Sequence, residues 1–277
     1  MTDQMDKYQL FQQLHLRTGA FVIPNPWDAG SARILAALGY EALATSSAGL
    51  AFSIGQQDSA ACISREAILQ NAQDIVNATN LPVSADLENG FGADPESCVM
   101  TISLAAKTGL VGGSIEDATG DPNNPIFDFN LAVERIAAAV EESRKHPFML
   151  TARAENFLHG KRDLDDTILR LQAFEKAGAD VLYAPGLPDI AAIRTVCASV
   201  TRPVNVVMGL SGPTYSVSEL EQAGVKRISV GGSFARAALG GLMRAAREVK
   251  DHGTFTYAKD ALSSSEAEKY IFTPPKN

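Results

Sequence analysis

Short apolar runs alternate with helical patterns along nearly the whole chain, and this alternation restricts the fold more than any other feature. Eight such runs are expected to be strands, at residues 21–24, 42–45, 82–86, 111–116, 148–153, 179–184, 204–208 and 228–232. The helical patterns that follow them lie at residues 29–38, 64–79, 94–108, 128–145, 163–177, 188–199, 215–223 and 233–250. Short apolar strands flanked by helices are parallel and buried on both faces. We therefore predict an α/β fold, a (β/α)8 TIM-type barrel of parallel strands.

The main competing fold is a doubly wound open sheet. Such a sheet usually carries a Gly-Xaa-Gly-Xaa-Xaa-Gly turn after its first strand, and we find no such turn here. Residues 1–250 are therefore expected to form a single barrel domain, with its active site at the C-terminal ends of the strands. The tail at residues 251–277 is expected to pack on a partner subunit.

Acidic side chains and one arginine follow three successive expected strands. Asp86 and Glu88 end one strand, Glu116 ends the next, and Arg153 and Glu155 end the third. Because parallel strands end at one rim, we expect these side chains to converge. Converging carboxylates repel one another unless a cation neutralises them, and oxygen ligands suit Mg²⁺ or Mn²⁺. The alternative is that the same carboxylates cap helices or pair with Lys and Arg.

Two further groups at strand ends suit an anionic ligand. The Arg153 guanidinium offers a fixed fork of donors to a carboxylate or phosphoryl oxygen, or else pairs with a neighbouring glutamate. Ser46, Ser47 and Gly49 follow the second expected strand in a turn of small residues. Backbone N–H groups in such a turn can hold a carboxylate.

Composition and charge exclude several classes of function. The 277-residue chain has 32 acidic and 24 basic residues, a net charge of −8, and no basic block, which disfavours nucleic acid as a partner. No apolar run reaches the roughly 20 residues that span a bilayer, and the N-terminus has no signal-peptide pattern. The three cysteines form no Cys-Xaa-Xaa-Cys pair, which disfavours a disulfide framework or a zinc site. We expect a cytoplasmic enzyme that binds neither nucleic acid nor a membrane.

Taken together, the motifs resemble those of the isocitrate lyase/phosphoenolpyruvate mutase superfamily. The similarity covers residues 20–245, with the motifs in the family's order. The matching stretches are Pro24–Asp28, Thr45–Gly49, Gly55–Asp58, Asp86–Gly92, Ser114–Asp117 and Ala152–Glu155.

The resemblance implies a (β/α)8 barrel with a swapped C-terminal helix, assembled as a dimer or tetramer. It also implies Mg²⁺ as cofactor and 2-oxo or 2-hydroxy acids, held as chelates of that ion, as substrates. By this similarity Asp86 is a metal ligand, and Asp58, Glu88 and Glu116 reach the ion directly or through water. Ser46 and Ser47 would hold the substrate carboxylate.

The distal anionic group of the substrate would be held by Arg153, on the same resemblance. The residues assigned to the substrate are Ser46, Ser47, Gly49, Arg153, Trp27 and Asn205. The residues assigned to catalysis are Arg153, Glu116 and Tyr183.

The chain departs from the family in the residues that move protons. Family lyases that split methylisocitrate or isocitrate carry a Lys-Xaa-Cys-Gly-His loop after the fourth strand, whose cysteine protonates the product enolate. Here residues 117–127 contain no Cys, Lys or His. The mutase-type loop is matched only loosely, by Asn123 and Asn124, and Tyr183 begins the stretch where mutase relatives place a histidine. The usual Asp-Xaa-Asp is replaced by residues 86–88, Asp-Leu-Glu.

Two residues remain as candidate proton donors. Tyr183 lies at the end of the sixth expected strand, and His159 lies in the loop after the fifth, where it could equally be a solvated loop residue. The loop at residues 117–127 is either a lid that excludes water or an ordinary surface loop.

We therefore predict a Mg²⁺-dependent carbon–carbon lyase or decarboxylase. It would act on a small 2-hydroxy or 2-oxo dicarboxylic acid through an enolate stabilised by the ion, and yield a 2-oxo acid such as pyruvate. One alternative is carbon–phosphorus chemistry, as a phosphonopyruvate hydrolase or a phosphoenolpyruvate mutase relative. Another is a non-catalytic binding protein on the same fold.

Overall fold

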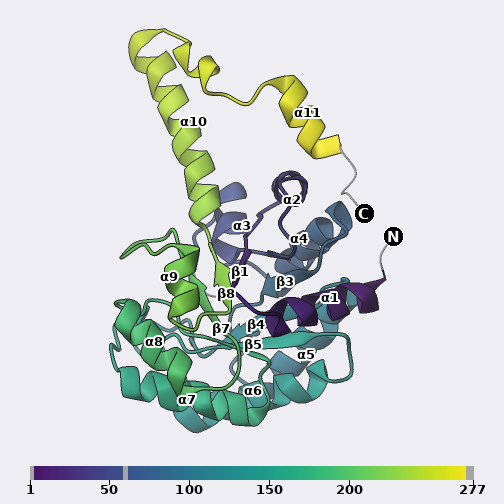
Figure 1. Cartoon of the computed structure of the whole chain (residues 1–277), viewed down its shortest axis with the longest axis vertical. Helices are drawn as coiled ribbons and strands as arrows, with labels where there is room; N and C mark the ends of the chain where they lie inside the picture. Colours follow the sequence, from purple (N-terminus) through teal and green to yellow (C-terminus); the bar gives the residue numbers. More distant parts are fainter. Residues whose placement is uncertain (1–2, 59–61, 273–277) are drawn as a thin grey trace.

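Eight parallel strands follow one another around a nearly closed barrel in the computed structural model, which describes residues 3–58 and 62–272 (Figure 1). The strands are β1 (Phe21–Ile23), β2 (Leu43–Ala44), β3 (Val83–Asp86), β4 (Gly112–Glu116), β5 (Met149–Arg153), β6 (Val181–Tyr183), β7 (Val204–Val207) and β8 (Arg227–Ser229). Their order is β1-β8-β7-β6-β5-β4-β3-β2, and Ala44 N donates to Pro24 O at 3.0 Å where the two ends of the sheet meet. The predicted (β/α)8 barrel is confirmed.

Helices alternate with these strands along the chain. They are α1 (Gln4–Leu16), α2 (Ala29–Ala37), α3 (Ser47–Ser53), α4 (Arg65–Ala78), α5 (Pro95–Lys107), α6 (Phe129–Ser143), α7 (Leu164–Ala177), α8 (Ile190–Ser199), α9 (Val217–Gln222), α10 (Ser233–His252), the 3-10 turn η1 (Thr256–Lys259) and α11 (Ser264–Phe272). Local chemistry sets their starts. Asp28 accepts from Ser31 N at 2.7 Å, and Asp94, followed by Pro95, accepts from Ser97 N at 2.7 Å.

The main core lies between the strands and the surrounding helices. Ile102 of α5, Ile115 of β4 and Phe174 of α7 are all fully buried in it. Gly113 marks how closely this core is packed, because a Cβ there would lie 2.6 Å from Leu87 Cδ1 and 2.9 Å from Phe148 Cζ. The strand ends are therefore held in fixed positions.

Two local expectations from the sequence are wrong. Residues 46–49 do not form a simple turn, because Ser46 caps the short helix α3 by accepting from Gly49 N at 3.1 Å. The last strand is Arg227–Ser229 rather than residues 228–232, and its first residue is a buried arginine. Both errors concern residues at the edge of the cavity described below.

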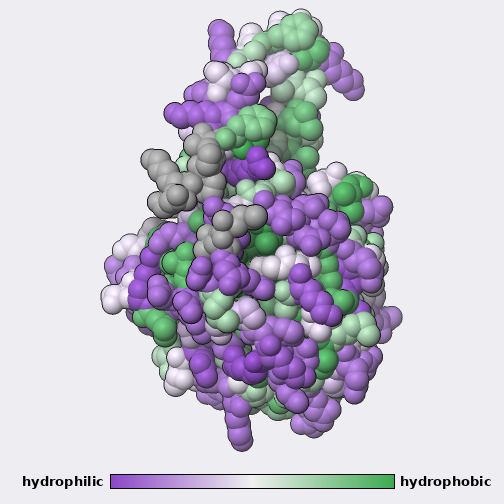
Figure 2. Space-filling model, turned by 90° about the vertical axis from the view of Figure 1, so that its right-hand side faces the viewer, coloured by the Kyte–Doolittle hydropathy of each residue, from purple (hydrophilic) through white to green (hydrophobic). Residues whose placement is uncertain are grey.

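Helix α10 extends away from the barrel, and the chain then returns so that α11 lies against α2 (Figure 1). Arg33 Nη1 donates to Ile271 O at 3.0 Å across this contact. Hydrophobic side chains gather on the projecting arm in Figure 2, and Leu239, Leu242 and Met243 of α10 are exposed. In the part of the chain that the structure describes, no helix is long and apolar enough to cross a membrane.

Helix α1 closes the end of the barrel opposite the carboxylates. Phe11, Leu14 and His15 of α1 are buried there, and the His15 ring meets the edges of Phe11 and Phe21 with centroids 4.7 and 5.0 Å apart. His15 Nδ1 lies 2.8 Å from Phe11 O, which places the ring proton on Nδ1. Burial, with the nearby Arg227 charge, lowers the pKa of His15 to about 3.

This histidine should make the protein less stable in mild acid. The unfolded chain takes up a proton on His15 near pH 6.5 and the folded chain does not, so the free energy of unfolding falls as the pH drops from about 6.5 towards 3. Between pH 7 and pH 5 we expect wild type to lose about 2 kcal/mol more than His15→Gln. Urea unfolding at both pH values measures this, and an equal loss in both proteins would contradict it.

Candidate functional site

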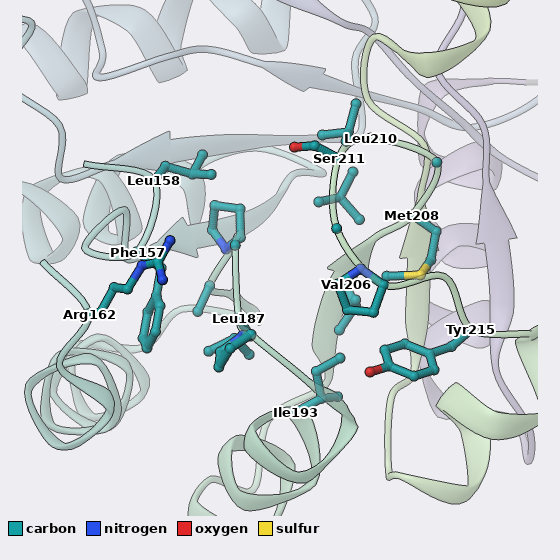
Figure 3. A pocket seen from close by; sticks show the side chains of 18 residues that line it. Phe157, Leu158, Arg162, Leu187, Ile193, Val206, Met208, Leu210, Ser211 and Tyr215 are labelled. Carbon is teal, nitrogen blue, oxygen red and sulfur yellow. The ribbon is translucent and has the colours of Figure 1, made fainter. Parts of the chain in front are cut away.

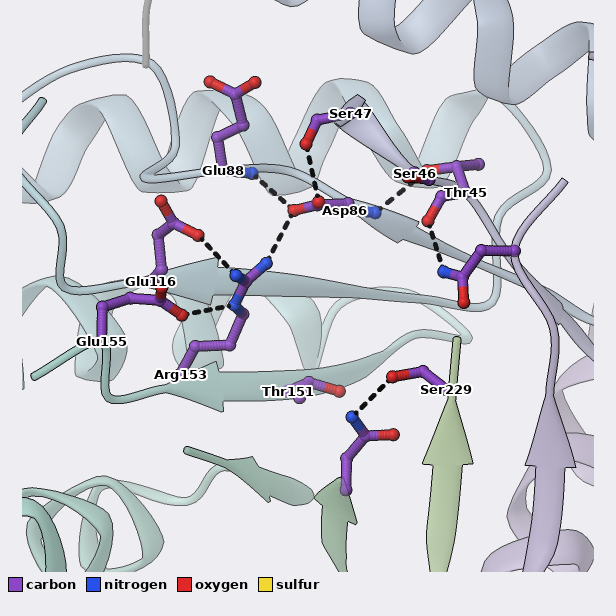
Figure 4. Close-up of polar contacts among 12 residues, drawn as sticks. Thr45, Ser46, Ser47, Asp86, Glu88, Glu116, Thr151, Arg153, Glu155 and Ser229 are labelled. Atoms are coloured by element: carbon purple, nitrogen blue, oxygen red, sulfur yellow. Dashed lines mark hydrogen bonds and ion pairs between the residues drawn. The ribbon is translucent and has the colours of Figure 1, made fainter. Parts of the chain in front are cut away.

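Arg153 binds three carboxylates that come from the ends of three strands (Figure 4). Its Nη1 lies 3.0 Å from Asp86 Oδ1, its Nη2 lies 3.1 Å from Glu116 Oε2, and its Nε lies 2.9 Å from Glu155 Oε1. The guanidinium carbon also lies 5.1 Å from the centre of the Tyr183 ring. The convergence predicted from the strand ends is therefore present, with an arginine at its centre.

Asp86 is the most highly connected of these carboxylates. Its Oδ2 accepts from Ser47 Oγ at 3.0 Å, and its Oδ1 accepts from the backbone N of Glu88 at 3.3 Å as well as from Arg153. Its backbone N donates to Thr45 Oγ1 at 3.0 Å. Glu88 has φ of 47°, a left-handed backbone that is costly for a residue with a side chain and is found mostly at functional sites.

Burial and neighbouring charge shift the ionisation of this cluster. Burial raises the pKa of Glu116 well above its usual range; the Arg153 charge opposes this, and the nearby Glu155, Asp86 and Glu88 charges add to it. Burial likewise raises the pKa of Tyr183 above its ordinary value. The phenol therefore keeps its proton at neutral pH.

A second buried ion pair supports the cluster from behind. Asp117 accepts from Arg170 Nη1 at 3.0 Å and from the backbone N of Glu155 at 2.8 Å. Burial raises the pKa of Asp117 to about 6, although both of these contacts favour its charged form. Glu155 is thereby held in the orientation in which it meets Arg153.

The chemistry of the donor set fits a hard divalent cation. Three carboxylates surround one guanidinium, so the cluster has more negative than positive charge, and its ligand atoms are oxygens. Within residues 3–58 and 62–272, no three His, Cys, Asp or Glu side chains form a ready-made metal cluster. Arg153 lies between the carboxylates, and Glu88 points away from Asp86 in Figure 4. The four ligands expected from the sequence therefore remain a prediction.

A polar cavity of about 200 Å³ opens beside Arg153. The residues predicted for the site that line it are Ser46, Ser47, Asp58, Asp86, Arg153, Tyr183 and Asn205. Trp27 and Gly49 lie behind this lining, and a Cβ on Gly49 would come within 2.8 Å of Trp27 Cβ, so that contact requires glycine. Gly49 N donates to Ser46, and His159 is exposed in its loop rather than in the lining.

A larger cavity of about 430 Å³ adjoins the first and shares part of its lining (Figure 3). The shared residues are Leu158, Pro185, Val207 and Leu210. Much of the remaining wall is apolar, including Phe157, Ile193 and Val206, and Arg162 is its charged member. Asp58, Asp86 and several hydroxyl-bearing side chains line the smaller cavity, which we treat as the candidate active site.

Two parts of the cavity were missed by sequence reasoning. In the sequence, Thr45 stands out only as part of a matching motif, although its hydroxyl fixes the Asp86 backbone. Arg227 lies outside the last expected strand, although it is buried and lines the cavity. A charged residue two positions before Ser229, on the same face of a buried strand, was the available signal.

Comparison with known proteins places these features in one family. The phosphoenolpyruvate phosphomutase family model matches residues 11–250. A crystal structure from Burkholderia cenocepacia J2315, of a protein provisionally named a lyase/mutase, is 56% identical with a TM-score of 0.95, covering 98% of this chain and 97% of that one. A second structure from the same organism, provisionally named a phosphonomutase, is 35% identical with a TM-score of 0.78, covering 90% and 99%. The 2-methylisocitrate lyase of Escherichia coli K12 is 28% identical over 207 residues, which is 72% of this chain and 69% of the relative.

Removal of the central guanidinium should destabilise the fold in a pH-dependent way. In metal-free buffer at pH 8, we expect Arg153→Met to lower the free energy of unfolding by about 3–5 kcal/mol, because buried carboxylates lose their counter-charge. Burial already raises the pKa of Glu116 and loss of the Arg153 charge raises it further, so the folded variant takes up a proton and regains stability as the pH falls to 6. Urea unfolding at the two pH values measures both effects.

Arg144→Met is the matched control for this experiment. Arg144 pairs with Asp180 at 2.9 Å, but its side chain is 45% exposed. Its loss should cost less than about 1 kcal/mol. If Arg153→Met were no less stable than this control, or gained nothing on acidification, the central role of Arg153 would be wrong.

Proposed function

This chain belongs to the phosphoenolpyruvate phosphomutase family, within the isocitrate lyase/phosphoenolpyruvate mutase superfamily, and from that premise we propose that it is a divalent-metal-dependent lyase or decarboxylase. Its substrate would be a small 2-hydroxy or 2-oxo dicarboxylic acid, and its product a 2-oxo acid such as pyruvate. The observation that carries the proposal is the group of carboxylates around Arg153 at the strand ends, beside a polar cavity.

The metal would be held by oxygen ligands at the end of this cavity that lies beside Asp86 and Arg153. Asp86 is the best candidate, with Asp58, Glu88 and Glu116 as direct or water-mediated ligands, and Mg²⁺ or Mn²⁺ suits such a set. A divalent ion there would act as a Lewis acid towards the oxygens of a 2-oxo acid and orient them.

The chain's own residues would bind the substrate and move the proton. Ser46 accepts from Gly49 N, so its hydroxyl proton can be donated to the substrate carboxylate, while Ser47 fixes Asp86. Tyr183 lines the cavity and is protonated at neutral pH, so it is the candidate proton donor even though its raised pKa makes it a weak acid. This would supply the acid that the loop at residues 117–127 lacks.

Arg153 would serve the substrate end that lies nearest the carboxylates. In this structure each of its three nitrogens already donates to a carboxylate, those of Asp86, Glu116 and Glu155. If one of these carboxylates were a ligand of a bound cation instead, an N–H of Arg153 would be available to a substrate oxygen. Its first role is thus to position the carboxylates.

Carbon–phosphorus chemistry is the second candidate. It is favoured by the family model that matches and by the 35% identical phosphonomutase-like structure. The same cavity could hold phosphonopyruvate, with its phosphonate in place of a second carboxylate. The two candidates give different products, so one assay separates them.

We propose that the protein is a homo-oligomer, a dimer or tetramer, in which the arm formed by α10 and η1 packs on a partner, while α11 contacts α2 of its own chain. The support is the exposed apolar side chains of that arm, including Leu239, Leu242 and Met243 (Figure 2). A stable interface of this kind would bury such side chains.

A cytoplasmic location is kept as a prediction from the sequence.

The proposed reaction can be tested directly with the pure protein. We expect Mg²⁺-dependent pyruvate release from at least one of oxaloacetate, 2-methylisocitrate, dimethylmalate and phosphonopyruvate, measured by a coupled assay with phosphate followed in parallel. Pyruvate without phosphate supports the lyase or decarboxylase, and pyruvate with phosphate supports the alternative. If the chelator-treated protein is as active as the Mg²⁺-loaded one, metal dependence is wrong.

Asp86→Asn should lower kcat on the responding substrate by at least about 100-fold, because the loss of this charge weakens metal binding. Asp74→Asn, an exposed carboxylate on α4, is the matched control and should be unaffected. If Asp86→Asn needed no more Mg²⁺ than wild type for half-maximal activity, Asp86 would not be a metal ligand.

The oligomer is tested by light scattering after gel filtration. We expect wild type to run as a dimer or tetramer, and Leu242→Glu to shift towards a single chain because it places a charge in the apolar contact. Leu16→Glu is the control, since Leu16 is exposed on α1, far along the chain from the arm. A monomeric wild type would rule out this assembly.

A further inference from the structure

Arg227 is a buried cation on the inner face of the barrel, and the mechanism above leaves it without a role. It is only 6% exposed and projects from the start of β8. Its Nε donates to Asn205 Oδ1 at 2.8 Å and its Nη2 donates to Thr151 Oγ1 at 3.0 Å, and its Nη1 lies 3.5 Å from His15 Nε2. All three partners are uncharged, because His15 is neutral at physiological pH.

The other buried arginines are compensated differently. Arg153 meets three carboxylates and Arg170 meets two, Asp117 and Asp166. Arg135 donates to backbone carbonyls of the loop after β3, including Gly92 O at 2.6 Å. In the described residues Arg227 makes no ion pair within 4 Å. Of these four arginines, only Arg153 and Arg227 line the cavity.

The lining around Arg227 is unusual for a barrel interior, which bulky branched side chains normally fill. Here small polar side chains from four strands line the cavity, namely Ser84, Ser114, Asn205 and Ser229. Asn205 Nδ2 donates to Ser229 Oγ at 3.0 Å, so the Asn205 oxygen faces Arg227. The result is a polar cavity with the positive charge of Arg227 at its floor, the end nearest α1.

A buried charge with only neutral partners is expensive, and Arg227, unlike Arg135, carries such a charge in the wall of a cavity where a ligand can supply the opposite charge. Burial lowers the pKa of Arg227 to about 10, so it is still charged at neutral pH. A guanidinium has five N–H donors, and the three contacts above use one on each nitrogen. One N–H on each Nη therefore remains to be shared with an incoming carboxylate.

We propose that Arg227 binds the carboxylate at the end of the substrate that lies away from the metal, so that the enzyme selects dicarboxylic over monocarboxylic acids. This rests on the function proposed above and goes beyond it by assigning the distal carboxylate to Arg227 rather than to Arg153. Arg153 is already neutralised by three carboxylates, while Arg227 is not. Thr151, which Arg227 contacts, precedes Arg153 by two residues on β5, about 6.6 Å deeper along the strand. A short dicarboxylic acid can span such a depth.

The proposal is tested by equilibrium binding with Mg²⁺ present, using three probes. Oxalate has two carboxylates but no distal one, and lactate and malate differ by the distal carboxylate alone. Isothermal titration calorimetry of wild type should show malate binding roughly 10- to 100-fold more tightly than lactate, the gain expected of a charge-assisted hydrogen-bonded pair.

Two variants separate a binding role from a structural one. Arg227→Met removes the charge and the hydrogen bonds of the guanidinium, and Arg227→Gln removes the charge but keeps a side chain that can donate a hydrogen bond. In both we expect the preference for malate over lactate to disappear, while the affinities for oxalate and lactate change less than about threefold, because those ligands do not reach Arg227. Should Arg227→Met fail to fold, Arg227→Gln still decides.

The outcomes distinguish this proposal from the proposed function. If oxalate binds in a Mg²⁺-dependent way but wild type does not prefer malate, the role of Arg227 is overturned and the metal-dependent site stands. If both variants weaken oxalate, lactate and malate equally, Arg227 is structural and the proposal is wrong. If none of the three ligands binds to wild type, both proposals fail.

Discussion

The site depends on one ion-pair network, in which the Arg153 guanidinium holds Asp86, Glu116 and Glu155 together. These carboxylates come from the ends of three strands, and the positive charge of Arg153 between them offsets their mutual repulsion. Asp117 and Arg170 support the network from behind, and Thr45 and Ser47 fix Asp86 from the adjacent strand and helix. The barrel supplies the rigidity that this costly arrangement needs.

Charge is distributed along the axis of the barrel in a way that suits a small dianion. The open end carries more carboxylate than guanidinium, which favours a cation, while the floor carries Arg227 among neutral groups. Helix α1 closes the far end with apolar side chains and the neutral His15. A substrate would thus meet positive charge at both ends, from the bound ion above and from Arg227 below.

The sequence predicted the barrel because its signals are local and repeated. Apolar runs, the caps at Asp28 and Asp94, and Pro95 at a helix start each act within a few residues. The convergence of Asp86, Glu116 and Arg153 followed from strand order alone. The three-way pairing at Arg153 could not be predicted, because it depends on distances across the barrel. Helix α3 was missed because Ser and Gly have low helix propensity, although the side chain of Ser46 caps its start.

The central claim is that the carboxylates around Arg153 form a site for one divalent cation. The most direct measurement is a Mn²⁺ titration of the wild-type protein by electron paramagnetic resonance, with proton release followed in weakly buffered solution. We expect one ion bound per chain and release of protons, because Glu116 has a raised pKa and must ionise to face the metal. Absence of stoichiometric binding, or binding that is independent of pH, would contradict it.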